Sequence, residues 1–163
     1  MTEKDYNDCV DTHSDGVYRF IVKNIRNSED ARDIVQSAFE KLWINRQQVE
    51  TLKAKSYLFT VAYHQMIDLI RKEKRIPKVV PHYEGAQQTS VQSSSELKQL
   101  LFSAINELSP IQKSLVLLKD YEGYTYQEIG EIMNLSESQV KVYLHRARLF
   151  LKSKLTQLEK VNI

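Results

Sequence analysis

The chain has 163 residues, of which 42% are hydrophobic, 27% are charged and only four are glycine, and its formal net charge is +2. These proportions are typical of a globular protein and exclude a disordered, collagen-like or strongly polyelectrolytic chain. Sandwiches and barrels need many tight turns, so the scarcity of glycine and proline also argues against an all-β fold.

The compartment can be predicted from three features of the sequence. The N-terminal segment has no apolar signal core, and no apolar stretch reaches the roughly 20 residues of a membrane span. The single cysteine, Cys9, cannot form an internal disulfide, which fits a reducing environment. We therefore expect a cytoplasmic protein.

Apolar residues spaced three and four positions apart predict three helices in the first half of the chain. The first covers residues 17–25. The second carries an apolar stripe over residues 31–43, with Ser28 placed to cap its N-terminus. The third is expected from about Ser56 to Arg75. Together these helices predict an N-terminal helical module over residues 1–76.

The third predicted helix has a polar face that ends in cations. An aromatic, hydroxyl and imidazole face of this kind suits single-stranded or melted nucleic acid, because bases stack or hydrogen-bond while cations hold the backbone. The alternative is a solvated surface with an internal Asp68–Arg71 pair. The residues of this face are Tyr57, Thr60, His64, Asp68, Arg71 and Arg75.

The periodic pattern stops after the third helix. Residues 79–95 contain no lysine or arginine, show no helical period and end in a run of serines. This composition predicts a flexible linker over residues 77–95. A loop folded onto the core is the alternative.

Helix-start and helix-stop signals divide residues 96–163 into several helices. Gly123 is expected to end one of them, and Asn134 can adopt the left-handed conformation of a tight turn. Three capping-box patterns are present: Ser109 with Gln112, Thr125 with Glu128, and Ser136 with Gln139. The fold is therefore predicted to be all-α, with two small helical modules joined by a flexible linker.

Residues 126–148 follow the plan of a helix-turn-helix, with a short helix, a tight turn and a longer basic helix. Gly130 stands where the two helices must cross closely. The outward face of the second helix would carry polar and basic side chains able to contact bases and phosphates. A basic solvated helix without function is the alternative. The outward residues include Ser138, Lys141, Val142 and His145, and Arg146 and Arg148 suit phosphates.

Signals for catalysis or metal binding are weak. His64 and Asp68 lie one helical turn apart, but no third ligand or nucleophile accompanies them. The sequence contains no phosphate-binding loop, nucleophile elbow or zinc signature. We therefore expect no enzyme activity, no cofactor, no metal and no small-molecule substrate.

Three segments in this order and spacing resemble an extracytoplasmic-function sigma factor of bacterial RNA polymerase. They are DARDIVQSAFEKLW (30–43), KSYLFTVAYHQMIDLIRKEKR (55–75) and LSPIQKSLVLLKDYEGYTYQEIGEIMNLSESQVKVYLHRAR (108–148). The resemblance covers nearly the whole chain apart from the linker and the extreme ends. It implies that the protein binds core RNA polymerase and promoter DNA and is held inactive by an anti-sigma factor, either membrane-bound or soluble.

The resemblance also implies a role for each region. Residues 1–76 would dock on the polymerase and recognise and melt the minus-ten element, with a flipped base near residues 50–55, and residues 96–163 would read the minus-thirty-five element. The linker would thread the polymerase cleft. The residues implied for docking are Asp30, Asp33, Gln36, Phe39 and Glu40; for the minus-ten element, Tyr57, Thr60, His64, Asp68, Arg71 and Arg75; and for the minus-thirty-five element, Ser138, Gln139, Lys141, Val142, His145, Arg146 and Arg148.

The sequence departs from the family at His64, which stands where these proteins usually have asparagine. This departure bears on base preference at the minus-ten element. Two other classes of protein are weighed against the resemblance. A stand-alone dimeric helix-turn-helix regulator would bind operator DNA, but it has no use for the acidic segment 29–40. A helical adaptor that binds no DNA would leave both basic faces without a role.

Overall fold

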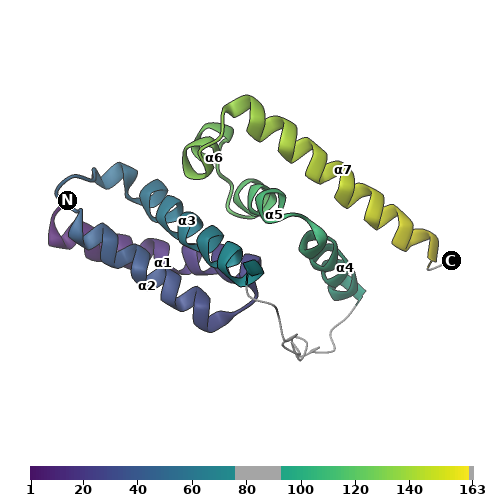
Figure 1. The fold of residues 1–163 in the computed structure, drawn as a ribbon, viewed down its shortest axis with the longest axis horizontal. Helices are drawn as coiled ribbons and strands as arrows, with labels where there is room; N and C mark the ends of the chain where they lie inside the picture. The colour runs from purple at the N-terminus through teal and green to yellow at the C-terminus, as the bar shows by residue number, and fades with distance from the viewer. Residues whose placement is uncertain (76–92, 162–163) are drawn as a thin grey trace.

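The computed structural model describes residues 1–75 and 93–161, and every regular element in these ranges is helical (Figure 1). This confirms the predicted all-α class. None of the described helices is both long enough and apolar enough to span a bilayer. The elements are α1 (Glu3–Ile25), α2 (Ser28–Ile44), η1 (Thr51–Lys53), α3 (Ala54–Arg75), α4 (Ser93–Glu107), α5 (Pro110–Val116), η2 (Leu117–Tyr121), α6 (Tyr126–Met133) and α7 (Glu137–Val161).

Helices α1, α2 and α3 pack against one another and form the first module. Thr2 and Asp5 form a capping box at the start of α1. The predicted cap of α2 was wrong by one residue: the N-cap is Asn27, whose side-chain oxygen accepts a hydrogen bond from the backbone N–H of Asp30 at 3.0 Å. Ser28 is instead the first residue of the helix. Asparagine and serine cap helices about equally well, so the two positions could not be separated by residue type.

Helices α4 to α7 form the second module, and the helix caps and turn residues predicted for it are confirmed. The capping boxes at Ser109 and Thr125 are present, and Ser136 and Gln139 make the same reciprocal pair of hydrogen bonds at the start of α7. Gly123 and Asn134 have φ of 76° and 55°, so both lie in the left-handed region. The predicted linker, residues 77–95, lies outside the described residues except for its last three, which belong to α4.

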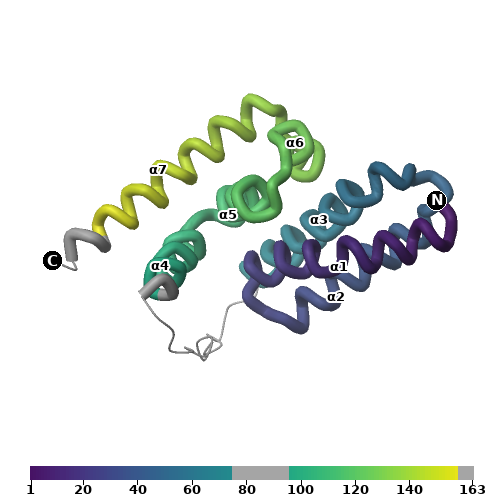
Figure 2. The backbone as a smooth tube through the Cα atoms, turned by 180° about the vertical axis from the view of Figure 1, so that it is seen from behind, coloured from purple at the N-terminus to yellow at the C-terminus, as the bar shows by residue number. Residues whose placement is uncertain are grey.

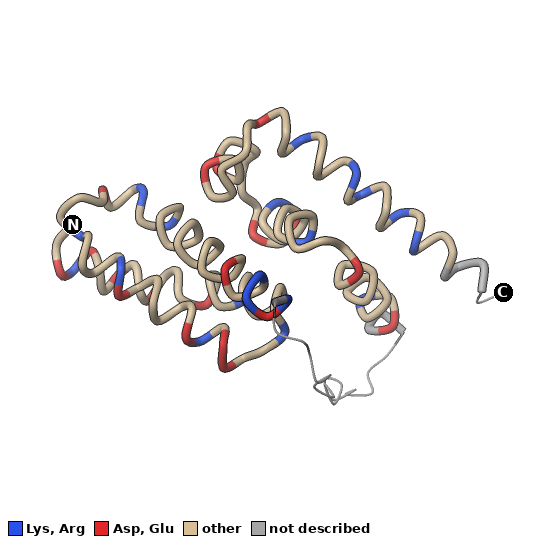
Figure 3. Tube along the Cα trace, viewed as in Figure 1, with Lys and Arg blue, Asp and Glu red and all other residues tan. Residues whose placement is uncertain are grey.

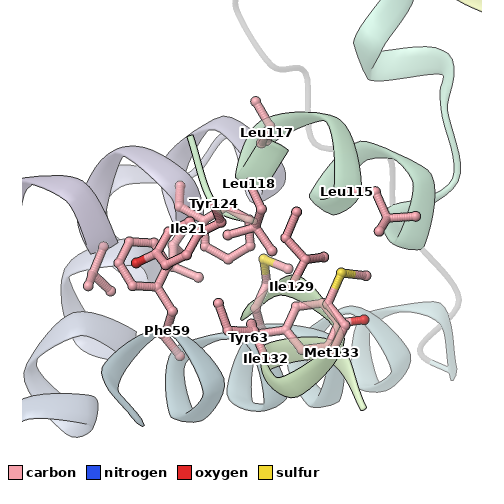
Figure 4. Close-up of a cluster of buried hydrophobic side chains, with 14 of the residues drawn as sticks. Ile21, Phe59, Tyr63, Leu115, Leu117, Leu118, Tyr124, Ile129, Ile132 and Met133 are labelled. Carbon is pink, nitrogen blue, oxygen red and sulfur yellow. The ribbon is translucent and has the colours of Figure 1, made fainter. Parts of the chain in front are cut away.

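The two modules pack against each other, in what we term the closed arrangement. Helix α3 packs against α6, and α1 contacts α5, while the start of α1 and the far end of α7 lie on opposite sides of the molecule (Figures 1 and 2). Buried side chains from both modules form one continuous hydrophobic cluster (Figure 4). Within it, the ring of Phe59 meets the ring of Tyr124 edge-on, with centroids 5.1 Å apart.

Polar contacts cross the same interface. The Lys113 amine donates a hydrogen bond to the backbone carbonyl of Asn24 at 2.9 Å, and the Ser114 hydroxyl lies 3.2 Å from the side-chain oxygen of Asn24. Arg19 and Glu122 form an ion pair at 3.4 Å. These contacts join residues about 90 to 100 positions apart in the chain.

Two of the buried polar groups at this interface are poorly compensated. Lys113 is only 6% exposed, and burial, followed by the charge of Arg26, lowers the pKa of its amine to about 8. The hydroxyl of Tyr124 is buried and has no hydrogen-bond partner among the described residues. Burial also raises the pKa of this hydroxyl, since the ionised form would be desolvated.

Candidate nucleic-acid interfaces

The helix-turn-helix in the second module is set by one close backbone approach. A Cβ on Gly130 would stand 2.6 Å from the carbonyl oxygen of Leu135, a distance no side chain can occupy without moving the backbone. The left-handed Asn134 turns the chain between α6 and α7. The carbonyl of Gly130 accepts hydrogen bonds from the N–H groups of Asn134 and Leu135, which fixes the turn. Gly130 is therefore required by the turn: the predicted close crossing of the two helices gives only an ordinary contact, since the same Cβ would lie 3.9 Å from the side chain of Val140 in α7.

The outer face of α7 is exposed and basic. Val140, Leu144, Ala147 and Leu151 face the core, so the positions between them point outward. Figure 3 shows lysine and arginine along this helix, and residues 138–158 contain no acid. The exposed residues among those predicted to read the minus-thirty-five element are Ser138, Gln139, Lys141, Val142, His145, Arg146 and Arg148.

Three of these exposed residues already have partners within the protein. The Gln139 side-chain oxygen accepts a hydrogen bond from the N–H of Ser136, which leaves its amide N–H groups free to donate. Lys141 pairs with Glu137 at 3.3 Å across one helical turn. Both side chains of that pair are more than half exposed, so the interaction is weak and DNA can replace it.

Arg148 is held by a stronger contact. Its guanidinium lies 2.6 Å from a carboxylate oxygen of Asp120 in the π-helical turn η2. The hydrogen bond to Asp120 raises the pKa of Arg148. The predicted phosphate contact of Arg148 therefore competes with an intramolecular pair that ties α7 to η2. The sequence analysis did not identify Asp120 as a partner, because it lies 28 positions before Arg148 and outside the helix-turn-helix.

Helix α3 has three faces with different surroundings. One face packs on α1 and α2, and a second, with Lys55, Phe59 and Tyr63, faces the second module. Successive residues turn by about 100° around a helix axis, so His64 stands about 140° away from Phe59. The polar face that includes His64 therefore points away from the second module and stays accessible in the closed arrangement.

The predicted minus-ten residues divide into two groups on this third face. Tyr57 and Thr60 are half-buried: the hydroxyl of Tyr57 accepts a hydrogen bond from the Asn45 side chain at 3.0 Å, and the hydroxyl of Thr60 donates to the carbonyl of Ser56. The exposed group is His64, Asp68 and Arg71, and no Asp68–Arg71 ion pair forms. The side chain of Arg75 lies outside the described residues.

A cavity of about 450 Å³ opens beside Tyr57, between the end of α2 and the start of α3. Five of its six lining residues have polar side chains, and their amide, carboxylate, amine and hydroxyl groups can hydrogen-bond to the edges of a base. The neighbouring Leu52 is 96% exposed. The sequence prediction placed a flipped base near residues 50–55 but missed the groups from the end of α2, whose only signal was a polar run after the helix. The lining residues are Asn45, Gln48, Val49, Glu50, Lys53 and Tyr57.

The predicted docking residues lie on α2, which packs on α1 and α3. Asp33, Gln36 and Glu40 are exposed, and Gln36 donates a hydrogen bond to Glu40 at 3.3 Å. Asp30 is half-buried in the first turn of α2, where the positive end of the helix dipole stabilises its carboxylate. Phe39 is only 8% exposed and belongs to the core, so it supports α2 from within.

Residues 1–75 and 93–161 contain no cluster of three or more metal-ligating side chains that could bind a metal ion. The geometry instead offers two exposed polar helices, one in each module, and an acidic helix face on the first module. Both helical faces suit nucleic acid, because they combine cations with groups that hydrogen-bond to bases.

Comparison with protein families accounts for both modules. Residues 9–76 match Sigma-70 region 2, and residues 98–151 match Sigma-70, region 4. The chain is 32% identical over 141 residues to the ECF RNA polymerase sigma factor SigM of Bacillus subtilis. This match covers 84% of this chain and 86% of SigM.

Solved structures share the fold. The chain resembles the sigma factor RpoE in its complex with the anti-sigma factor NepR from Bartonella quintana, with a TM-score of 0.73 and 24% identity over 94% of this chain and 98% of that chain. It also resembles CnrH in complex with the cytosolic domain of CnrY, with a TM-score of 0.71 and 18% identity over 96% and 90% of the two chains.

Proposed function

The chain belongs to the extracytoplasmic-function (ECF) RNA polymerase sigma factors, and we propose which of its surfaces performs each step of promoter recognition. The protein directs transcription initiation by giving core polymerase its promoter specificity. We assign residues 1–76 to polymerase docking and the minus-ten element, and residues 96–163 to the minus-thirty-five element. It works as a cytoplasmic specificity subunit and leaves catalysis to the polymerase.

Helix α7 reads the minus-thirty-five element in this proposal. Lys141 can donate to guanine and the methyls of Val142 can contact thymine, while His145 can reach a base or a phosphate. Arg146 contributes phosphate contacts, which supply affinity that depends on salt. Arg148 joins them when its Asp120 pair is exchanged for a phosphate, which costs part of the energy the contact provides.

Helix α3 and the cavity beside Tyr57 capture the melted minus-ten strand. A base turned out of the stack fits a cavity of about 450 Å³ whose lining offers both donors and acceptors. The exposed Arg71 holds the backbone further along the same face. His64 can donate or accept at a base edge, so it replaces the usual asparagine with a group whose charge depends on pH.

The exposed polar face of α2 docks on the polymerase. Asp33, Gln36 and Glu40 supply carboxylate and amide groups to a complementary basic surface of the core enzyme. This face lies outside the contact between the modules, so the closed arrangement leaves it accessible.

Reading two separated promoter elements requires the modules to part. In the closed arrangement α3 and α6 are in contact, so the reading faces of α3 and α7 belong to one compact body. An anti-sigma factor is a fitting partner for this state. Both solved structures of similar fold contain a bound partner: RpoE is bound to the anti-sigma factor NepR, and CnrH is bound to the cytosolic domain of CnrY.

The observation that carries the proposal is that one chain has two exposed polar helix faces with cations, one in each module, together with an acidic face on α2. The test is a titration of labelled protein with sigma-free core polymerase at moderate salt, with the housekeeping sigma factor as competitor. Tight, one-to-one and competable binding is expected. No binding to core, combined with dimeric and salt-dependent binding to duplex DNA alone, would favour the operator-binding regulator instead.

A further inference from the structure

A cavity of about 300 Å³ lies at the junction of the two modules and takes its lining from both. The end of α1 supplies Arg26, the last turns of α3 supply Glu73, and α5 supplies Lys113. Apolar side chains of Ile70 and Leu108 complete one side. The cavity therefore combines two cations, one acid and an apolar wall.

The two cations are not neutralised by the protein. Neither Arg26 nor Lys113 forms an ion pair within the described ranges, and Glu73 pairs with neither of them. Among the described residues, the amine of Lys113 donates its one hydrogen bond to a neutral group, the carbonyl of Asn24. The positive charge of Arg26 opposes protonation of Lys113 across the cavity, so the two like charges repel each other.

Such a site has a definite electrostatic preference. A buried amine beside a second cation is costly in a medium of low dielectric, and a negative charge between them would relieve that cost. The volume lies at the lower end of the range for small-molecule sites, which combine apolar lining with a few placed polar groups.

We propose that the junction cavity binds a small organic anion, with a carboxylate or phosphoryl group between Arg26 and Lys113 and an apolar portion against Ile70 and Leu108. The ligand binds to the closed arrangement alone, because the groups that hold it come from both modules. By linkage it stabilises that arrangement. This consequence for regulation depends on the function proposed above; the binding itself does not.

Calorimetric titration of the full chain tests the site without polymerase. The probes are inorganic phosphate, glycerol 3-phosphate and butyrate, with uncharged glycerol as a blank. Binding of one equivalent is expected, with a Kd of about 1 mM or tighter. A response to both phosphate compounds but not to butyrate would assign the phosphoryl group, and the reverse would assign the carboxylate. No binding by any of the three anions would overturn the proposal.

Three variants identify the location of the site. Arg26→Gln and Lys113→Met are each expected to weaken binding by at least about tenfold, because each removes one of the two charges. Arg19→Gln is the matched control, since Arg19 crosses the same interface through its pair with Glu122 but does not line the cavity. Equal loss in the control, or unchanged binding in both cavity variants, would contradict the assignment.

A second arm tests the regulatory consequence. Saturating anion is expected to weaken promoter binding by the wild-type holoenzyme, because the two elements are read only when the modules part, and to have no such effect on Lys113→Met. Anion binding without any effect on promoter binding would remove the regulatory role and leave the site. Failure of the wild type to bind core at all would instead count against the sigma function, so the two failures are distinguishable.

Discussion

The carbonyl oxygen of Leu135 occupies the space that a Cβ on Gly130 would need, at a distance of 2.6 Å. We predict that Gly130→Ala destabilises the protein by about 1–3 kcal/mol, because α6 and the turn must move apart. Urea denaturation measures the loss. Gly16→Ala is the matched control, since the nearest atom to its added methyl is 3.5 Å away. An equal change in free energy of unfolding for the two variants would contradict the close approach of Gly130 to the turn.

The exposed face of α7 gives a second prediction. Lys141→Ala and Arg146→Ala should each weaken promoter binding by about 1–3 kcal/mol if they contact base edges, and by less if they contact only phosphates. Core polymerase binding should be unchanged, because both side chains are exposed on α7 and away from α2. Fluorescence anisotropy with promoter DNA and with core enzyme separates the two effects. Loss of core binding in either variant would contradict this assignment.

The docking face of α2 can be tested by charge reversal. Asp33→Arg should weaken holoenzyme assembly by at least about tenfold, and Gln36→Ala by less, because reversal adds repulsion while truncation only removes a contact. Asp11→Arg, at an exposed position on α1, is the matched control. Competition against the housekeeping sigma factor provides the measurement. Normal assembly with both α2 variants would exclude this face as the docking surface.

Lys113 makes stability depend on pH. Its pKa falls from 10.5 to about 8, so between these values the unfolded chain holds more protons than the folded one and the free energy of unfolding rises with pH. Below pH 8 the folded state carries the buried charge. We predict that Lys113→Met is more stable than the wild type at neutral pH by on the order of 1–3 kcal/mol.

The measurement is urea denaturation of wild type and Lys113→Met at a series of pH values. The difference between the two proteins should shrink as the pH rises through 8, since other titrating groups cancel in the comparison. Lys98→Met, at an exposed position on α4, is the control, and its free energy of unfolding should change with pH in parallel with that of the wild type. A constant difference between Lys113→Met and wild type would show that the amine is not desolvated.

Much of the fold could be predicted because its signals are local. Capping boxes, the left-handed Asn134 and the small residue at Gly130 each involve residues within a few positions of one another. The apolar stripe of α2 predicted the helix correctly, although its cap is Asn27 rather than Ser28. Periodicity identifies which residues are buried but does not locate a helix start to one position.

The site could be predicted only in part, because several of its contacts are distant in sequence. The Arg148–Asp120 pair and the contribution of Asn45 to the cavity both depend on how helices pack. The packing of the modules was not predicted, since Phe59 and Tyr124 each suit the core of their own module equally well. Apolar pattern alone does not say which partner an apolar residue meets.

The buried hydroxyl of Tyr124 lowers the stability of the closed arrangement. A hydroxyl held away from water without a partner costs about 1–3 kcal/mol. Because the ring of Tyr124 packs on Phe59 of the first module, we expect separation of the modules to expose this hydroxyl and to remove that penalty. A partner that holds the modules closed must outweigh this penalty, and a polymerase that separates them is helped by it.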